Sequence, residues 1–308
     1  MARIVIFLAI LTMMVSTWLP MCATAQELSS TQELNDDTLQ QIRQSGVIQV
    51  GYLKSAIPFS YLDNKGLPIG YSIDHANLVV QAIKEKLGLP ELRVTMIPLS
   101  IQNRIPLLLR GIYDFECSFT TNIRKRHKLV AFSNIFFICS TRMLVERNSG
   151  IHDFADLQGK NVVVIAGTTS ENNLHDLNDR EQLGMRIICA KNYADALQTV
   201  VSSLATALVW DDVLLAGEVA SRPELHNWQI VGAPLSYEAY GCMLRPRDPQ
   251  FKQLIDEVIA DAQLSGKAEE LFQRWFNQPI PPNGINIKFA MSEAMRELFR
   301  NPNDRPFQ

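Results

Sequence analysis

The sequence lacks the short motifs that mark the common catalytic classes. It contains no G-x-S-x-G elbow, no H-E-x-x-H motif, no G-x-x-x-x-G-K-[ST] loop and no C-x-x-C pair. Five histidines without metal-ligand spacing are expected to be surface or structural residues: His75, His127, His152, His175 and His226. We therefore expect a protein that is not an enzyme and that carries no cofactor and no metal.

The charge balance shows no excess of positive charge. Lys and Arg number 29 against 32 Asp and Glu, which leaves a formal charge of -3 and makes nucleic acid an unexpected partner. The 308 residues are 47% hydrophobic, a globular composition in a chain too long for one compact core.

The first 25 residues have the pattern of a secretory signal peptide. A basic residue at Arg3 precedes an apolar run over 4–19, and Ala23-Thr24-Ala25 matches the small-residue cleavage pattern. The run is short for a membrane anchor. A lipoprotein with Cys22 modified stays open, although the preceding Met21 does not suit lipid attachment. We expect cleavage after residue 25, a flexible leader over 26–37 and a periplasmic protein.

Strand and helix patterns alternate along the rest of the chain, which predicts an α/β protein. Typical units are a strand over 47–51, a hairpin-like excursion over 58–73, and a helix that Asp74 caps and Gly88 ends. A terminal helix is expected near 292–299.

Two predicted helix starts follow strands and offer hydroxyls with free N–H groups. They are Thr120-Thr121-Asn122 and Gly167-Thr168-Thr169-Ser170-Glu171. Such starts favour a bound anion, but simple helix capping explains them equally well. Arg126, about one turn after the first, can bind a carboxylate through two parallel hydrogen bonds, or it is an exposed arginine in a basic run.

A pair of acids, Asp211-Asp212, closes the predicted strand over 207–210. The carboxyl end of such a strand is where ligands usually bind in open sheets. A carboxylate there can hold an ammonium group or can cap the next helix, and both readings stay open.

Together these segments resemble the periplasmic amino-acid-binding proteins of ABC importers, solute-binding protein family 3, and most closely the glutamate/aspartate-binding branch. The similarity covers nearly all of 38–304, with further matching segments at 57–61, 100–108, 113–117, 238–244 and 277–282.

The resemblance implies a two-lobe periplasmic-binding-protein fold, each lobe a mixed sheet flanked by helices, joined by a two-strand hinge. Residues 38–139 and 235–290 would form lobe 1, residues 140–234 lobe 2, and residues 291–308 a C-terminal helix and tail. A monomer would close on an amino acid and deliver it to the membrane permease of an ABC importer.

The resemblance also assigns roles to residues. Arg126, Thr121, Thr168 and Thr169 would bind the ligand's α-carboxylate, and Asp211 its α-ammonium. Cys117 and Cys242 stand where the branch also carries cysteines, so a disulfide between them is expected.

The side-chain pocket departs from the branch's pattern. Leu53 replaces an arginine, Ile101 and Phe119 replace serines, and Tyr193 replaces a histidine. Arg104 is retained, either for the ligand or for a structural pair with an acid such as Glu116. A buried ligand carboxylate would lose its partners, which costs several kcal/mol. We therefore expect a neutral or aromatic amino acid or derivative. A dehydratase of a prearomatic acid and a ligand-sensing domain remain the alternatives.

Overall fold

The computed structural model describes residues 37–306, so the predicted signal peptide and residues 26–36 of the leader lie outside the described residues. The α-helices are α1 (Thr38–Ser45), α2 (Tyr71–Leu87), α3 (Arg104–Leu109), α4 (Thr169–Glu181), α5 (Tyr193–Val201), α6 (Asp212–Ser221), α7 (Pro249–Leu264), α8 (Lys267–Asn277) and α9 (Glu293–Arg300). The strands are β1 (Val47–Leu53), β2 (Ser55–Ala56), β3 (Ser60–Leu62), β4 (Pro68–Ile69), β5 (Arg93–Leu99), β6 (Phe115–Glu116), β7 (Ala131–Glu146), β8 (Asn161–Ile165), β9 (Arg186–Ala190), β10 (Ala207–Asp211) and β11 (Trp228–Leu244).

One mixed sheet organises the described residues. Its strand order is β5-β1-β6-β11-β7-β10-β8-β9, and β2, β3 and β4 form a separate small sheet. The outer pairs β1–β5 and β8–β9 are parallel, whereas β7 pairs antiparallel with both β10 and β11. Parallel edges around an antiparallel centre give each end of the sheet its own α/β layer.

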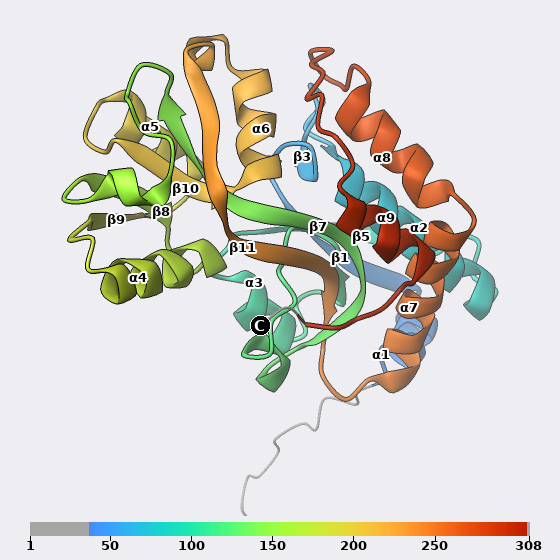
Figure 1. The fold of residues 1–308 in the computed structure, drawn as a ribbon. Coiled ribbons are helices and arrows are strands. Elements are labelled where there is room, and N and C mark those ends of the chain that lie inside the picture. The colour runs from blue at the N-terminus through green and yellow to red at the C-terminus, as the bar shows by residue number, and fades with distance from the viewer. Residues whose placement is uncertain (1–36, 307–308) are drawn as a thin grey trace, which may run out of the picture. The chain divides into compact units, whose positions relative to one another are not determined.

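The strands β7 and β11 connect the two ends of the sheet. They are the longest strands described, at 16 and 17 residues, and they lie side by side through the middle of the molecule (Figure 1). Their register breaks between Val231 and Ser236, near the crossing expected at Pro234, and β7 passes Ser140, the other expected crossing. The lobe boundaries themselves stay a prediction.

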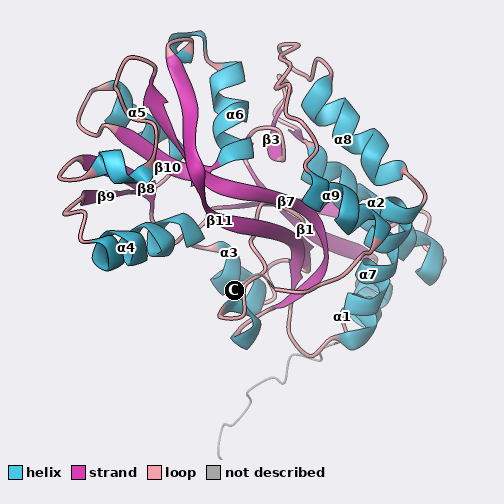
Figure 2. Ribbon diagram, in the orientation of Figure 1, coloured by secondary structure: helices cyan, strands magenta, loops and turns pink. Residues whose placement is uncertain are grey.

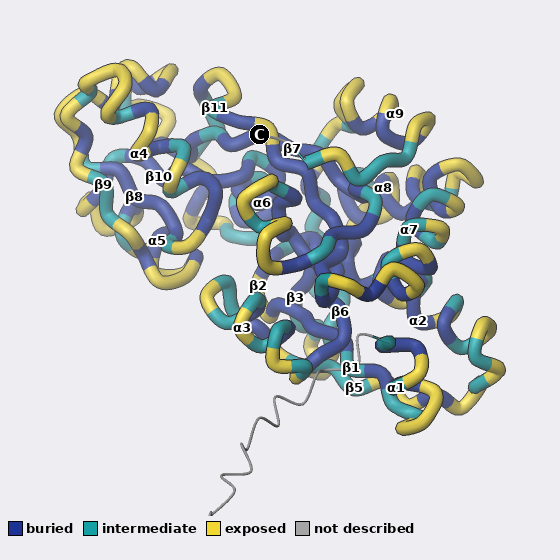
Figure 3. Tube along the Cα trace, turned by 90° about the horizontal axis from the view of Figure 1, so that it is seen from below, coloured by how far each residue is buried: buried dark blue, intermediate teal, exposed yellow. Residues whose placement is uncertain are grey.

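Helices cover the sheet in two groups. Figure 2 shows α4, α5 and α6 around β8 and β10, and α2, α7, α8 and α9 beside β1 and β7. The strands are mostly buried while the helices expose their outer faces (Figure 3). A small apolar cluster around Met143, Val164 and Val209 packs on one face of β8 and β10. A larger cluster, rich in aromatic residues, includes Val163 and Leu208 of the same strands and extends through the rest of the described residues.

The start of α2 corrects two expectations. Gly70, not Asp74, is the N-cap residue, and the helix begins at Tyr71, inside the segment over 58–73 that was expected to be a hairpin-like excursion. Tyr71 N–H donates to Pro58 O at 2.8 Å and Ser72 N–H to Phe59 O at 3.0 Å, so backbone carbonyls satisfy the first N–H groups of the helix. A side-chain cap is therefore unnecessary.

Cys117 and Cys242 are joined by a disulfide that ties the segment after β6 to β11. Cys139 is free and buried, and Cys189 is free and exposed.

Burial lowers the pKa of His75 to about 3, so this histidine is a neutral core residue. Within residues 37–306 no helix is long and apolar enough to cross a membrane.

Candidate ligand-binding site

A cavity of about 140 Å³ lies between segments from the two halves of the fold. Its lining comprises Leu53, Lys54, Ser55, Ala56, Leu99, Ser100, Ile101, Gln102, Phe119, Lys191, Asn192, Tyr193 and Trp210. The structure thus brings together the four residues that were expected to replace polar pocket groups: Leu53, Ile101, Phe119 and Tyr193. Trp210 is a lining residue that the sequence did not point to as part of the site.

Aromatic rings build one wall of this cavity. Tyr193 stacks on Trp210 with ring centroids 4.9 Å apart, and Phe119 meets Trp210 edge-on at 5.7 Å. The Tyr193 hydroxyl is buried and has no hydrogen-bond partner among the described residues. The wall is therefore apolar apart from one free hydroxyl.

Arg104 lies behind the cavity rather than among its lining residues. It is 2% exposed, and its guanidinium carbon stands 5.6 Å from the centre of the Phe119 ring. Arg104 Nη1 donates to Thr120 Oγ1 at 2.7 Å, and Thr120 Oγ1 donates to Glu116 Oε1 at 2.6 Å. The arginine is thus linked to Glu116 through a hydroxyl, which favours the structural reading of this residue.

The Arg126 segment differs from the predicted helix start. The chain after Thr121 makes a turn and then a 3-10 helix of three residues, Arg126–Lys128, because Thr121 pairs with Tyr240 of β11 in a β-bridge. Arg126 Nη1 donates to Thr121 O at 2.9 Å. Burial and the positive charge of Arg104 lower the pKa of Arg126 to about 10. No carboxylate of residues 37–306 forms an ion pair with Arg126, although the charges of Glu238, Glu116 and Asp211 act on it from a greater distance.

A cluster of buried acids lies where β7, β10 and β11 meet. Tyr240 OH donates to Asp211 Oδ2, while Thr141 Oγ1 lies 3.4 Å from Asp211 Oδ1 and 3.2 Å from Glu238 Oε1. Burial and the neighbouring Glu238 raise the pKa of Asp211 well above its usual range. The sequence analysis missed Glu238, although a glutamate inside a buried strand was a signal.

Asp212 has a different role from Asp211. It accepts hydrogen bonds from the Ser140 backbone N–H, at 3.2 Å, and from the Ser140 hydroxyl. It therefore fastens the first turn of α6 to β7 at Ser140, one of the two expected crossings. Asp211 makes no side-chain cap and stays within the acid cluster.

The second predicted helix start is where it was expected. Thr168 caps α4 by accepting from Glu171 N–H at 3.2 Å, and Glu171 Oε2 accepts from Gly167 N–H at 2.7 Å. The Thr169 hydroxyl donates to Glu238 Oε2 at 2.7 Å. The start of α4 is therefore tied to β11 beside the acid cluster.

The two halves are in contact around the cavity. Gln102 Nε2 donates to Lys191 O at 2.9 Å and to Ala166 O at 3.3 Å. On another side of the interface, α6 approaches so closely that a β-carbon at Gly217 would stand 2.3 Å from Ile57 O. These contacts hold the segments on both sides of the cavity together.

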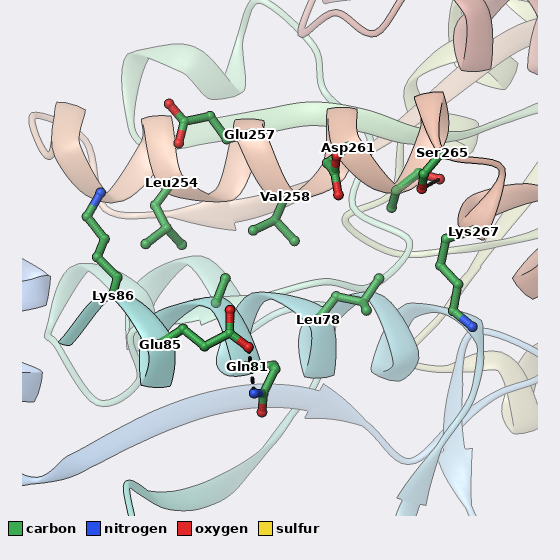
Figure 4. A pocket seen from close by; sticks show the side chains of 12 residues that line it. Leu78, Gln81, Glu85, Lys86, Leu254, Glu257, Val258, Asp261, Ser265 and Lys267 are labelled. Carbon is green, nitrogen blue, oxygen red and sulfur yellow. Dashed lines mark hydrogen bonds between the residues drawn. The ribbon is translucent and has the colours of Figure 1, made fainter. Parts of the chain in front are cut away.

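A larger groove, of about 600 Å³, lies between α2 and α7 (Figure 4). Charged side chains such as Glu85 and Lys86 rim it, and Leu78, Leu254 and Val258 form its floor. It contains none of the predicted site residues.

The mixed sheet with its covering helices defines a periplasmic-binding-protein-like α/β fold. Residues 48–278 match the model of the bacterial extracellular solute-binding proteins, family 3, and the chain belongs to that family.

Two curated relatives and one solved structure support the assignment. The chain is 52% identical to the glutamate/aspartate import solute-binding protein of Salmonella typhimurium and 50% identical to the protein of that name in Escherichia coli, in each case over 87% of this chain and 89% of the relative. An ancestral arginine-binding protein bound to arginine superposes with a TM-score of 0.67 at 26% identity, covering 75% of this chain and 98% of that one. The curated names describe import proteins, in agreement with the expectation that this chain is not an enzyme.

Proposed function

We propose that the protein captures one free amino acid in the cavity between its lobes and delivers it to the permease of an ABC importer. The observation that carries the proposal is a buried carboxyl group and a guanidinium that lie close to β11, each without a partner of opposite charge in the described part of the chain. Arg126 has no carboxylate partner among the described residues, and Asp211 has no cationic one. A zwitterion supplies both partners.

The two groups are fixed relative to each other by the fold. Arg126 donates to Thr121 O, Thr121 pairs with Tyr240, and the Tyr240 hydroxyl donates to Asp211. We assign the α-carboxylate to Arg126, Thr121 and the α4 start at Thr168 and Thr169, and the α-ammonium to Asp211. Hydrogen bonds that involve a charged group, as these would, are stronger than hydrogen bonds between neutral groups.

The ligand side chain would enter this cavity against its apolar wall. Leu53, Ile101, Phe119, Tyr193 and Trp210 form that wall. Polar residues line the rest of the cavity: Lys54, Ser55, Ser100, Gln102, Lys191 and Asn192. A volume of about 140 Å³ suits one side chain and excludes a longer peptide. We therefore propose a neutral amino acid with an apolar or aromatic side chain.

A specific observation favours a second candidate, an acidic amino acid. Lys54 and Lys191 line the same cavity, and the guanidinium carbon of Arg104 stands 5.6 Å from the ring centre of Phe119, which also lines it. The names of both curated relatives also specify glutamate and aspartate.

Thermal unfolding of protein that has been unfolded and refolded to strip carried-over ligand tests the proposal. A ligand at a hundred times its dissociation constant adds about 2.7 kcal/mol, a shift of several degrees. We expect this shift in melting temperature with a neutral L-amino acid. Arg126→Lys should abolish it, because lysine keeps the positive charge but lacks the paired N–H donors of the guanidinium. The corresponding amine, which has no carboxylate, should give no shift. No shift with any L-amino acid would contradict the proposed function.

A further inference from the structure

Three metal-binding side chains of different types converge outside the cavity. Glu171 and His175 stand one turn apart on α4, and Cys189 lies near the end of β9. One ligand atom of each lies within 4.8 Å of the others, and Cys189 Sγ is 3.1 Å from Glu171 Oε1. The i, i+4 spacing puts the two helical ligands on one face of α4.

The site is built for access from solvent. His175 and Cys189 are exposed and Glu171 is half-buried. β9 is the edge strand of the sheet, and α4 runs along the same end of the molecule (Figure 1). An incoming ion can therefore keep a water molecule as a fourth ligand.

The donor set selects the class of ion. Thiolate, imidazole and carboxylate together suit Zn²⁺ and similar divalent transition metals, whereas Mg²⁺ and Ca²⁺ prefer oxygen ligands alone. A tetrahedral zinc ion places its ligand atoms about 3.3–3.8 Å apart. Side chains that are this exposed reach that spacing by small rotations.

We propose that Glu171, His175 and Cys189 form a three-residue site for Zn²⁺ or a closely similar divalent ion. The Cys189 sulfur loses its proton to solvent as the bond to the metal forms. Without metal, Glu171 Oε1 accepts a hydrogen bond from the Cys189 thiol. When the metal binds, this oxygen coordinates the ion instead, while Glu171 Oε2 keeps its hydrogen bond from Gly167 N–H. None of the three residues lines the amino-acid cavity, so the proposal does not depend on the proposed ligand.

Cobalt(II) titration of the untagged, metal-free exported protein, with the Cys117–Cys242 disulfide intact, tests the site. A thiolate ligand gives Co²⁺ an ultraviolet charge-transfer band, and we expect that band at one ion per chain, with Zn²⁺ abolishing it by competition. Cys189→Ser should remove the band, and His175→Gln should weaken Zn²⁺ binding at least about tenfold. Glu171→Gln should also weaken binding while its amide oxygen still accepts from Gly167 N–H.

His152→Gln is the matched control, because His152 is an exposed histidine of the same half that lies outside the site. It should bind both ions as the wild type does. The proposal would be overturned by absence of the band in the wild type or by a stoichiometry well below one. Equal Zn²⁺ affinity in the wild type and in a variant that combines Glu171→Gln, His175→Gln and Cys189→Ser would overturn it as well. Melting temperatures of all variants close to that of the wild type exclude unfolding as the cause of a loss.

Discussion

Gly217 in α6 is a position where one added methyl group should block closure. Its β-carbon would stand 2.3 Å from Ile57 O and 2.9 Å from Ile57 C, and real β-carbons essentially never approach another atom closer than 3.0 Å. The obstacle is backbone, so no side-chain rotation relieves it. Gly217 and Ile57 belong to opposite lobes in the proposed division, so opening the cleft removes the clash.

The expected cost follows from overpacking. Inserting a methyl group into a tightly packed contact costs about 1–3 kcal/mol, and each 1.4 kcal/mol is tenfold in affinity. Gly217→Ala should therefore weaken ligand binding about 5- to 150-fold. In the open form the same change should be neutral or stabilising, because alanine is favoured over glycine by about 1 kcal/mol inside a helix.

Isothermal titration with the stabilising amino acid and thermal unfolding without ligand separate these two effects. Ala220→Ser is the control, since it also adds one heavy atom to a partly buried position of α6. Ligand affinity in Gly217→Ala equal to that of the wild type would refute the reasoning. A marked fall in the ligand-free melting temperature would show that the clash is also present without ligand, and it would refute the reasoning as well.

Three further changes test other parts of the site. Leu53→Arg should create glutamate affinity and weaken binding of the neutral ligand, as measured by titration calorimetry; unchanged glutamate binding would remove the main support for the apolar pocket. Asp211→Asn should abolish ligand binding yet raise ligand-free stability at pH 8. The folded-state pKa of Asp211 lies above its unfolded value, so ionisation opposes folding as pH rises through the folded pKa, and the gain should shrink as pH falls towards the usual carboxyl range. A gain that grows on acidification would contradict this assignment. Cys117→Ala/Cys242→Ala should cost about 2–5 kcal/mol in unfolding free energy, and the wild type should show no free thiol at either position by mass spectrometry under non-reducing conditions.

Local patterns in the sequence foretold the elements with strong signals. Gly88 ends α2, Thr168 caps α4, and α9 lies within the expected terminal segment. Each signal acts through backbone N–H or carbonyl groups a few residues away, so it is readable without the tertiary structure.

The predictions from sequence were wrong or incomplete for segments whose hydrogen-bond partners lie far away in the chain. Thr121 does not start a helix because it pairs with Tyr240, which lies 119 residues further on (240 − 121). The full lengths of β7 and β11 were not anticipated, since their pairing is long-range and Gly232 and Pro234 interrupt the second strand's pattern. Pairing with a distant backbone segment cannot be predicted from the residues next to it in the sequence.

The family resemblance predicted some residues of the candidate site, and other residues were not predicted. Leu53, Ile101, Phe119 and Tyr193 were predicted to share a pocket from their places in the family pattern, and one cavity contains all four. Glu238 was missed because its role depends on burial beside Asp211. The convergence of Cys189 with the Glu171–His175 pair depends on where the fold places the end of β9 relative to the start of α4.

The ligand class is the central claim, and one comparison of affinities tests it most directly. Refolded, ligand-free protein would be titrated by calorimetry with L-leucine, L-phenylalanine and L-glutamate under the same conditions. The apolar pocket predicts that a neutral amino acid binds at least about tenfold more tightly than glutamate, a difference of about 1.4 kcal/mol. Tighter binding of glutamate than of either neutral amino acid would contradict the claim and would assign Arg104, Lys54 and Lys191 to the ligand's side-chain carboxylate.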